Sequence, residues 1–171
     1  DSMTRLLNRG TMEERIKEEL EAVEEGQNYA YIALDLDNFK QINDMYGHWA
    51  GDSIIMGISN ILREVYGNNA RIGRMGGDEF AVLLIGQAEG DVLRTAECIL
   101  EAIRAPFPLQ EGEARISSSV GVAFHSLEAA TPARLLKNAD VAMYRAKGEG
   151  RDRLWRYRPS TFTDSGYGRV F

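Results

Sequence analysis

The sequence predicts an α/β domain built around a mixed β-sheet, and three observations support this prediction. Segments that alternate like strands are separated by segments with helical spacing, which favours strands joined by covering helices. Two strand-like segments are joined by Gly76 and Gly77, which indicates a hairpin. The central elements follow in the order βαββαβ, which is that of a ferredoxin-like sheet. The composition, 44% apolar and 27% charged, is ordinary for a globular domain.

Caps, spacing and helix breakers mark the helical segments. Thr11 is followed three residues later by Glu14, a capping-box pattern that predicts a helix from there to about Glu25. Pro106 ends a later helix. The expected helices are 11–25, a stretch from about 41 that is interrupted near Gly47 and resumes over 51–66, 88–105, and 132–147.

Alternation of apolar and polar side chains marks the strands. Within residues 29–37 the apolar side chains share one face, so Asp35 and Asp37 share the other. Gly121 is a candidate for a β-bulge in a later strand. The expected strands are 29–37, 70–75, 79–86, 114–125 and 153–157.

Charge and composition exclude several classes of protein. The net charge is −6, and an acidic surface argues against general nucleic-acid binding. Residues 131–171 are basic, which suits a small anion, although charge also fluctuates along any chain. No apolar run approaches the roughly 20 residues that span a bilayer. The single Cys98 suits a reducing cytoplasm. Because the chain opens at Asp1, we expect a cytoplasmic piece of a longer protein, with or without a membrane anchor elsewhere in that protein, and no membrane contact by this piece.

Carboxylates gather where two predicted strands end or begin. Asp35 lies at the end of the first strand, followed by the backbone carbonyl of Leu36, and Asp78 and Glu79 lie at the hairpin tip. If these strands are neighbours, three or four carboxylates crowd one edge of the sheet and repel unless a cation separates them. Hard oxygen ligands suit Mg²⁺ or Mn²⁺. The alternative is that these aspartates cap the next element and that Gly-Gly-Asp is only a turn.

Polar residues after the first strand suit a nucleotide. The N–H groups that open the next helix are placed to face phosphate, and they belong to Asn38, Phe39 and Lys40. Asn43 and Asp52 carry the amide and carboxylate that match the hydrogen-bonding edge of guanine. His48 is a cap, a core histidine or a ligand contact.

A second basic region follows the last helix. Lys147 and Arg151 either clamp terminal phosphates or complement the helix dipole on a solvated face. The chain has no Walker loop, no HExxH and no cysteine-rich zinc spacing. Metal and phosphate chemistry without a P-loop therefore remains.

Five ordered motifs resemble those of one family over residues 1 to about 157. GGDEF at 76–80 is the unaltered signature of the GGDEF family, the diguanylate cyclases. DLDNFKQINDMYGHWAGD, SSVGVA and NADVAMYRAKGEGRDR resemble its other blocks, with Asp152 where Asn is common. DSMTRLLNR resembles its opening, with Met3 in place of the usual Leu. The chain is identified as a member, with a domain at 1–158 and a linker or appendage at 159–171.

The resemblance implies a five-stranded sheet wrapped by helices and related to adenylyl cyclase and polymerase palm domains. It implies condensation of two GTP into cyclic di-GMP with release of two pyrophosphates. Metal ligation is implied for Asp35, the Leu36 carbonyl, Asp78 and Glu79, the last of which is alternatively an aid to deprotonation of the 3′-hydroxyl. Guanine recognition is implied for Asn43 and Asp52 with His48 alongside, and phosphate binding for the backbone at 38–40 with Lys40, Lys147 and Arg151. Asp78, Glu79 and Lys40 are thus the implied catalytic residues.

Each domain is expected to bind one GTP, so two domains must face each other in a transient two-fold dimer. The fragment alone is expected to be mostly monomeric, and its parent to carry a sensor or other signalling domain. Many members have an inhibitory RxxD product site, but Gly67 and Ala70 stand at those positions here, so we expect no product inhibition through it. The alternatives are a catalytically silent GTP-binding regulatory domain and a cyclase that makes a mononucleotide ring.

Overall fold

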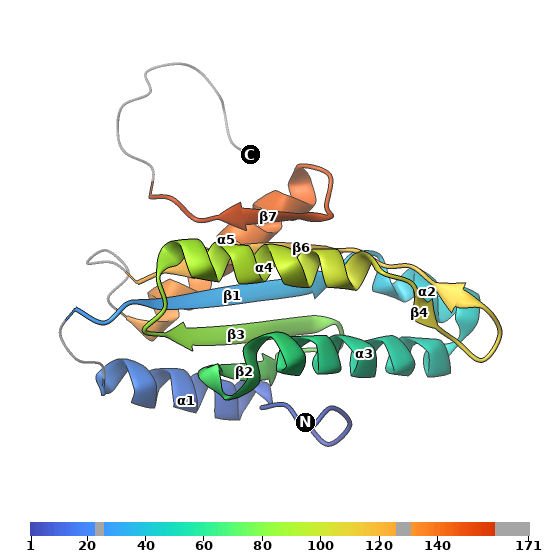
Figure 1. Ribbon diagram of the computed structural model, residues 1–171, viewed down its shortest axis with the longest axis horizontal. Helices are drawn as coiled ribbons and strands as arrows, with labels where there is room; N and C mark the ends of the chain where they lie inside the picture. The colour runs from blue at the N-terminus through green and yellow to red at the C-terminus, as the bar shows by residue number, and fades with distance from the viewer. Residues whose placement is uncertain (23–25, 126–130, 160–171) are drawn as a thin grey trace, which may run out of the picture.

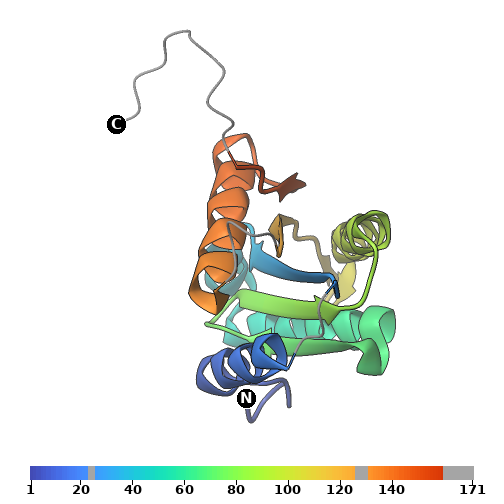
Figure 2. The ribbon, with the colours of Figure 1, turned by 90° about the vertical axis from the view of Figure 1, so that its left-hand side faces the viewer.

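A five-stranded sheet forms the centre of the computed structural model, which describes residues 1–22, 26–125 and 131–159. The strands lie in the order β2-β3-β1-β6-β7, and helices cover both faces (Figures 1 and 2). The strands of this sheet are β1 (Tyr29–Leu36), β2 (Ala70–Arg74), β3 (Glu79–Ile85), β6 (Ser118–Phe124) and β7 (Arg153–Arg156). The helices are α1 (Arg9–Glu21), α2 (Phe39–Tyr46), α3 (His48–Tyr66), α4 (Glu89–Arg104) and α5 (Pro132–Gly148), with a 3₁₀ turn η1 (Gly67–Asn69).

The sheet is mixed, as the sequence predicts. β1 lies at the centre and pairs antiparallel with both β3 and β6, whereas β7 joins β6 in parallel after the α5 crossover. The first four strands in space therefore have the ferredoxin-like order, and β7 extends one edge. None of the helices in the described ranges combines the length and apolar character needed to cross a bilayer.

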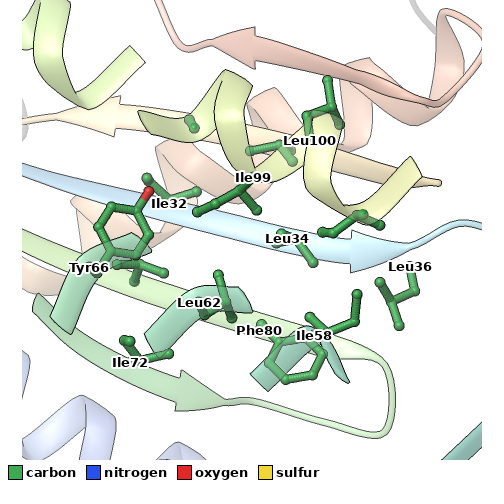
Figure 3. Close-up of a cluster of buried hydrophobic side chains, with 14 of the residues drawn as sticks. Ile32, Leu34, Leu36, Ile58, Leu62, Tyr66, Ile72, Phe80, Ile99 and Leu100 are labelled. Carbon is green, nitrogen blue, oxygen red and sulfur yellow. The ribbon is translucent and has the colours of Figure 1, made fainter. Parts of the chain in front are cut away.

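Alternation along β1 divides the core between the two faces of the sheet. All eight β1 residues are buried because helices cover both sides. The even-numbered side chains pack against α3 and α4, and the odd-numbered ones against α1 and α5. Figure 3 shows the larger cluster with Ile32, Leu34, Leu36, Ile58, Leu62, Tyr66, Ile72, Phe80, Ile99 and Leu100 labelled.

Several helices begin at residues other than those predicted, and in α1 a different residue provides the cap. α1 begins at Arg9, and the side chain of Asn8 accepts a hydrogen bond from the backbone N–H of Thr11 at 2.9 Å. The capping box at Thr11 is therefore wrong, since Asn caps at least as well as Thr and lies one turn earlier. The predicted last turn at 23–25 lies outside the described residues. α2 and α3 also begin earlier than predicted, and Gly47, with φ of 85°, separates them.

Two predictions about strands need correction. The strand expected from residue 114 begins at Ser118, because 113–114 form β5 (Glu113–Ala114), which pairs with β4 (Phe107–Pro108) in a separate hairpin. The connection between β2 and β3 holds four residues, 75–78, rather than two glycines alone. The proposed appendage begins at Pro159, and its remaining residues, 160–171, lie outside the described part of the chain.

Gly121 is not a bulge. The registers of β6 with β1 and with β7 run through it without interruption, pairing it with Ala33 on one side and Trp155 on the other. A Cβ at this position would overlap the backbone of α5, where the Cα of Met143 would be 2.9 Å away. Glycine is needed here because α5 lies directly on the strand.

We predict that Gly121→Ala lowers the free energy of unfolding by about 3 kcal/mol, because backbone atoms of α5 must move to admit the methyl group. Gly10→Ala is the control. Gly10 lies inside α1, and its nearest neighbour would be 3.7 Å from an added Cβ, so this change stabilises by about 0.5–1 kcal/mol. Urea unfolding measures both variants, and equal stability of Gly121→Ala and the parent would contradict the close helix approach.

Candidate functional site

The carboxylates predicted to act together meet where β1 ends and β3 begins. Asp35 and Glu79 are direct partners in the antiparallel register. The N–H of Leu36 donates a hydrogen bond to the carbonyl of Asp78 at 3.1 Å. Residues 44 and 42 positions apart in sequence are thereby held side by side at one end of the sheet. Asp35 and Glu79 point to the face that α1 and α5 cover, because paired residues of antiparallel strands share a face.

Asp35 is a buried carboxylate with one cationic partner. Its Oδ2 lies 3.1 Å from the Nζ of Lys147 in the last turn of α5. Burial raises the pKa of Asp35 from 3.8 to about 6; the hydrogen bond and charge of Lys147 oppose this rise, and the charges of Asp78 and Glu79 add to it. The neighbouring carboxylates therefore create a negative potential at Asp35, and this potential attracts a cation.

Glu79 is held from the N-terminal segment. The Nη2 of Arg9 lies 3.5 Å from the Glu79 carboxylate, and the Nε of Arg9 donates to the carbonyl of Met75 at 3.0 Å. Arg9 thus contacts both ends of the turn that carries Asp78. We assigned Arg9 no role from the sequence. Arg9 is the last residue of the DSMTRLLNR motif, and this position is the sequence signal that could have indicated a role at the site.

Arg74 ties the same turn to the start of the chain. Its Nε and Nη2 donate to the carbonyl of Gly77 at 3.1 and 2.8 Å, and its Nη1 lies 3.4 Å from the carboxylate of Asp1. The turn that holds Asp78 is therefore fixed by two arginines, one from α1 and one from β2.

Asp37 serves the structure rather than the site. It is buried and accepts hydrogen bonds from the hydroxyls of Ser117 and Ser119 at 2.7 and 2.6 Å and from the N–H of Asp152 at 3.0 Å. These bonds join the end of β1 to β6 and to the turn before β7. Asp37 thus holds strand ends together and does not cap the next helix. Within the part of the chain that the structure describes, Asp35 accepts no hydrogen bond from a serine hydroxyl or a backbone N–H.

The residues predicted to recognise guanine lie on α2 and α3. The Oδ1 of Asn43 lies so close to Gly51 that a Cβ there would overlap it, which places the amide against the residue that precedes Asp52. Asp52 and His48 are exposed on α3, and Gly47 is the N-cap residue. His48 is therefore neither a core residue nor a cap, and the contact with a ligand stays a prediction.

The start of α2 presents unused backbone donors. Asn38 adopts a left-handed conformation with φ of 55°, and its side chain makes no capping hydrogen bond. Within the described ranges, no hydrogen bond uses the N–H groups of Asn38, Phe39 or Lys40. Phe39 packs against the main core, whereas Lys40 is exposed. Donors at a helix start suit an anion.

The two residues at the end of α5 that are predicted to bind phosphate differ in their surroundings. Lys147 is engaged with Asp35, whereas Arg151 is exposed in the turn after α5, with φ of 62°. Asp152, where Asn is common in the family, also has positive φ, and its carboxylate accepts from the Nε of Arg104 at 2.8 Å. An acidic residue is accommodated at this position because Arg104 neutralises it.

The carboxylates do not form a complete metal cage. Among the described residues, no group of three or more His, Cys, Asp or Glu side chains is placed to hold a metal ion. The expectation of three or four crowded carboxylates reduces to three, because Asp37 is tied to serines, whereas the charges of Asp78 and Glu79 act on Asp35 and Glu79 also pairs with Arg9. Asp35, Asp78 and a backbone carbonyl remain, and this donor set fits Mg²⁺, which commonly takes one or two carboxylates together with substrate phosphates.

This fold and the site at the end of its central strand define a class of protein. Residues 1–153 match the family model "Diguanylate cyclase, GGDEF domain". The chain belongs to this family. It is 42% identical over 154 residues to the diguanylate cyclase TpbB of Pseudomonas aeruginosa, covering 88% of this chain and 35% of that protein. It is 35% identical over 153 residues to the bifunctional diguanylate cyclase/cyclic di-GMP phosphodiesterase MucR of the same species, covering 89% of this chain and 22% of MucR.

A solved structure supports the same assignment. The isolated GGDEF domain of TpbB from Pseudomonas aeruginosa superposes with a TM-score of 0.87 at 40% identity, covering 92% of this chain and 94% of that one. The five-stranded mixed sheet flanked by helices is therefore that of a GGDEF domain. The chain spans about a third or less of the length of these two curated relatives, which are larger proteins.

We predict that Asp35→Asn stabilises the metal-free protein in a pH-dependent way. The folded state binds the Asp35 proton more tightly than the unfolded chain, so this group's contribution to stability declines as pH rises from about 4 to about 6. The amide cannot titrate and escapes this decline. The unfolding free energy of the variant relative to the parent should rise by about 2 kcal/mol across that window.

Chemical unfolding in the presence of EDTA, at several pH values, measures this difference. Asp44→Asn, at an exposed position on α2, is the control and should show no comparable change. A constant difference between Asp35→Asn and the parent across the window would contradict the burial of a charged Asp35.

Proposed function

We propose that this chain is an active diguanylate cyclase domain that condenses two GTP into cyclic di-GMP and two pyrophosphates. The observation that carries the proposal is the fastening of Asp35 and Asp78 side by side at the end of β1, next to the unused N–H donors at the start of α2. Carboxylates for a divalent cation and donors for phosphate lie at the same end of the sheet. Family membership supports the same reaction.

The proposed roles are those that the family resemblance implies for these residues. The amide of Asn43 and the carboxylate of Asp52 recognise guanine, and exposed His48 borders them. The N–H groups of residues 38–40 bind phosphate oxygens, assisted by Lys40. Lys147 and Arg151 approach the terminal phosphates from the end of α5.

Asp35, the Leu36 carbonyl and Asp78 are the proposed ligands of Mg²⁺ or Mn²⁺, with Glu79 as a further ligand or as an aid to deprotonation. When bound, such ions neutralise charge on the attacking and leaving oxygens. The 3′-oxygen of one GTP forms a bond to the α-phosphorus of the other, the bond to the β-phosphate bridge breaks, and pyrophosphate leaves with that electron pair. The proton of the 3′-hydroxyl passes to Glu79 or to solvent. Binding groups that hold both nucleotides in line supply most of the rate.

Two copies of the domain are required, because each binds one GTP and the product contains two. A two-fold arrangement places each 3′-hydroxyl opposite the other α-phosphate. We propose that residues 1–158 form this unit and that a larger parent, as in the longer relatives, brings two units together. The unit itself needs no nucleic acid and no direct membrane contact for this reaction.

A dimerised form of the chain, incubated with GTP and Mg²⁺, tests the proposal. Mass spectrometry of the products should detect cyclic di-GMP. Binding of GTP without any product would favour the silent regulatory domain, and a cyclic mononucleotide would favour the other kind of cyclase.

We predict that Asp78→Ala lowers turnover by at least about a hundredfold, because charge stabilisation at the reacting phosphate is lost. Arg74 and Arg9 bind backbone carbonyls of the turn, so the fold should survive. Asp91→Ala, an exposed position on α4, is the matched control and should retain activity. Circular dichroism checks the fold, and retained activity in Asp78→Ala would remove the metal assignment.

We predict that Asp52→Ser weakens the preference for GTP over ATP by about tenfold to a hundredfold, because the acceptor for the donors of guanine is lost. Competition between the two nucleotides, followed by product analysis, measures the preference. Ser53→Ala, at the next exposed position of α3, is the control. An unchanged preference would show that guanine is read elsewhere.

A further inference from the structure

Lys147 pairs with Asp35, although its proposed role is to bind the terminal phosphates of the nucleotide. Its Nζ lies 3.1 Å from Oδ2 of Asp35, and the two side chains are 30% and 11% exposed. The preceding residue, Ala146, is fully buried, so the backbone of α5 is anchored at this point. The long side chain of Lys147 can reorient while its Cα stays in place.

The pairing of Asp35 with Lys147 competes with the proposed binding of metal and of phosphate at this end of the sheet. Asp35 is a proposed metal ligand and Lys147 a proposed phosphate ligand, yet here they pair with each other. A divalent cation that reached Asp35 in the absence of nucleotide would meet the ammonium group at close range. Repulsion between these cations opposes metal binding while Lys147 stays in place.

Other basic residues near the turn are engaged differently. Arg9 is held by Glu79 and by the carbonyl of Met75, so it stays on the turn. Arg151 lies exposed beyond the end of α5. The charged groups that act on Asp35 are Lys147, Asp78 and Glu79, and Lys147 is the one cation among them.

We propose that Lys147 is an exchangeable counter-ion of Asp35 that makes metal binding depend on nucleotide, an inference that rests on the proposed GTP and metal site. Without nucleotide, Lys147 neutralises Asp35. When triphosphate arrives, its oxygens attract Lys147 away and at the same time complete the ligand shell of the cation. Nucleotide and metal therefore bind cooperatively, and the protein avoids holding a divalent cation in an incomplete site.

Binding of Mn²⁺ to the nucleotide-free protein tests the exchange. Electron paramagnetic resonance of free Mn²⁺ gives the affinity, at a pH well above the pKa of about 6 for Asp35. Lys147→Met keeps the length of the side chain and removes the charge, and should strengthen Mn²⁺ binding by at least about fivefold. Lys147→Arg should stay close to the parent, as should Lys137→Met, which removes one charge from an exposed position of the same helix.

A second measurement adds a GTP analogue with a methylene group between the α- and β-phosphorus atoms. The analogue should strengthen Mn²⁺ binding more in the parent than in Lys147→Met, because the variant has no counter-ion to remove. Equal Mn²⁺ affinity of parent and Lys147→Met without nucleotide, while the analogue strengthens both equally, would overturn the exchange and leave the proposed reaction intact.

The chain without any substitution gives an independent measurement of the exchange. The side-chain nitrogen resonance of Lys147 should shift when the analogue and Mg²⁺ are added together, and an unchanged resonance would overturn the exchange. If the exchange is observed but the dimerised chain makes no cyclic di-GMP, the proposed reaction fails and the exchange stands. If no variant binds Mn²⁺ even with the analogue, both fail.

Discussion

The antiparallel pairing of β1 with β3 is the constraint on which the site depends. It sets Asp35 opposite Glu79 and bonds the N–H of Leu36 to the carbonyl of Asp78. A slip of one residue in this register would turn Asp35 from the α1/α5 face to the opposite face of the sheet. Burial of β1 on both faces resists such a slip, because every residue of the strand would exchange its apolar surroundings. The core that stabilises the domain therefore also aligns the carboxylates.

Placing carboxylates together at a buried strand end costs electrostatic free energy, and the structure offsets it with cations from distant segments. Lys147 comes from the end of α5 and Arg9 from the start of α1. Both are attached to elements that pack on the same face of the sheet. The N-terminal motif and the last block of the resemblance thus meet at one end of the sheet.

Local patterns predicted most of the elements and failed where a neighbour decided the outcome. Alternation in residues 29–37 and helical spacing in 132–147 were sufficient to locate β1 and α5. The prediction of a bulge at Gly121 was wrong because the need for glycine comes from the backbone of α5, which no local pattern reveals. Likewise, Asp35 and Asp37 both follow the alternation at the end of β1. Partners far away in sequence distinguish them, Lys147 for Asp35 and Ser117, Ser119 and Asp152 for Asp37.

The sequence by itself determined the family, the order of helices and strands, and the residue types from which a metal and nucleotide site is built, because these are carried by motifs and by local periodicity. The tertiary structure decided which charged side chains pair with each other. Pairing of Lys147 with Asp35 and of Arg9 with Glu79 depends on how two helices pack across the sheet. Such contacts join positions far apart in the chain, and electrostatic interactions depend on distance in space rather than in sequence.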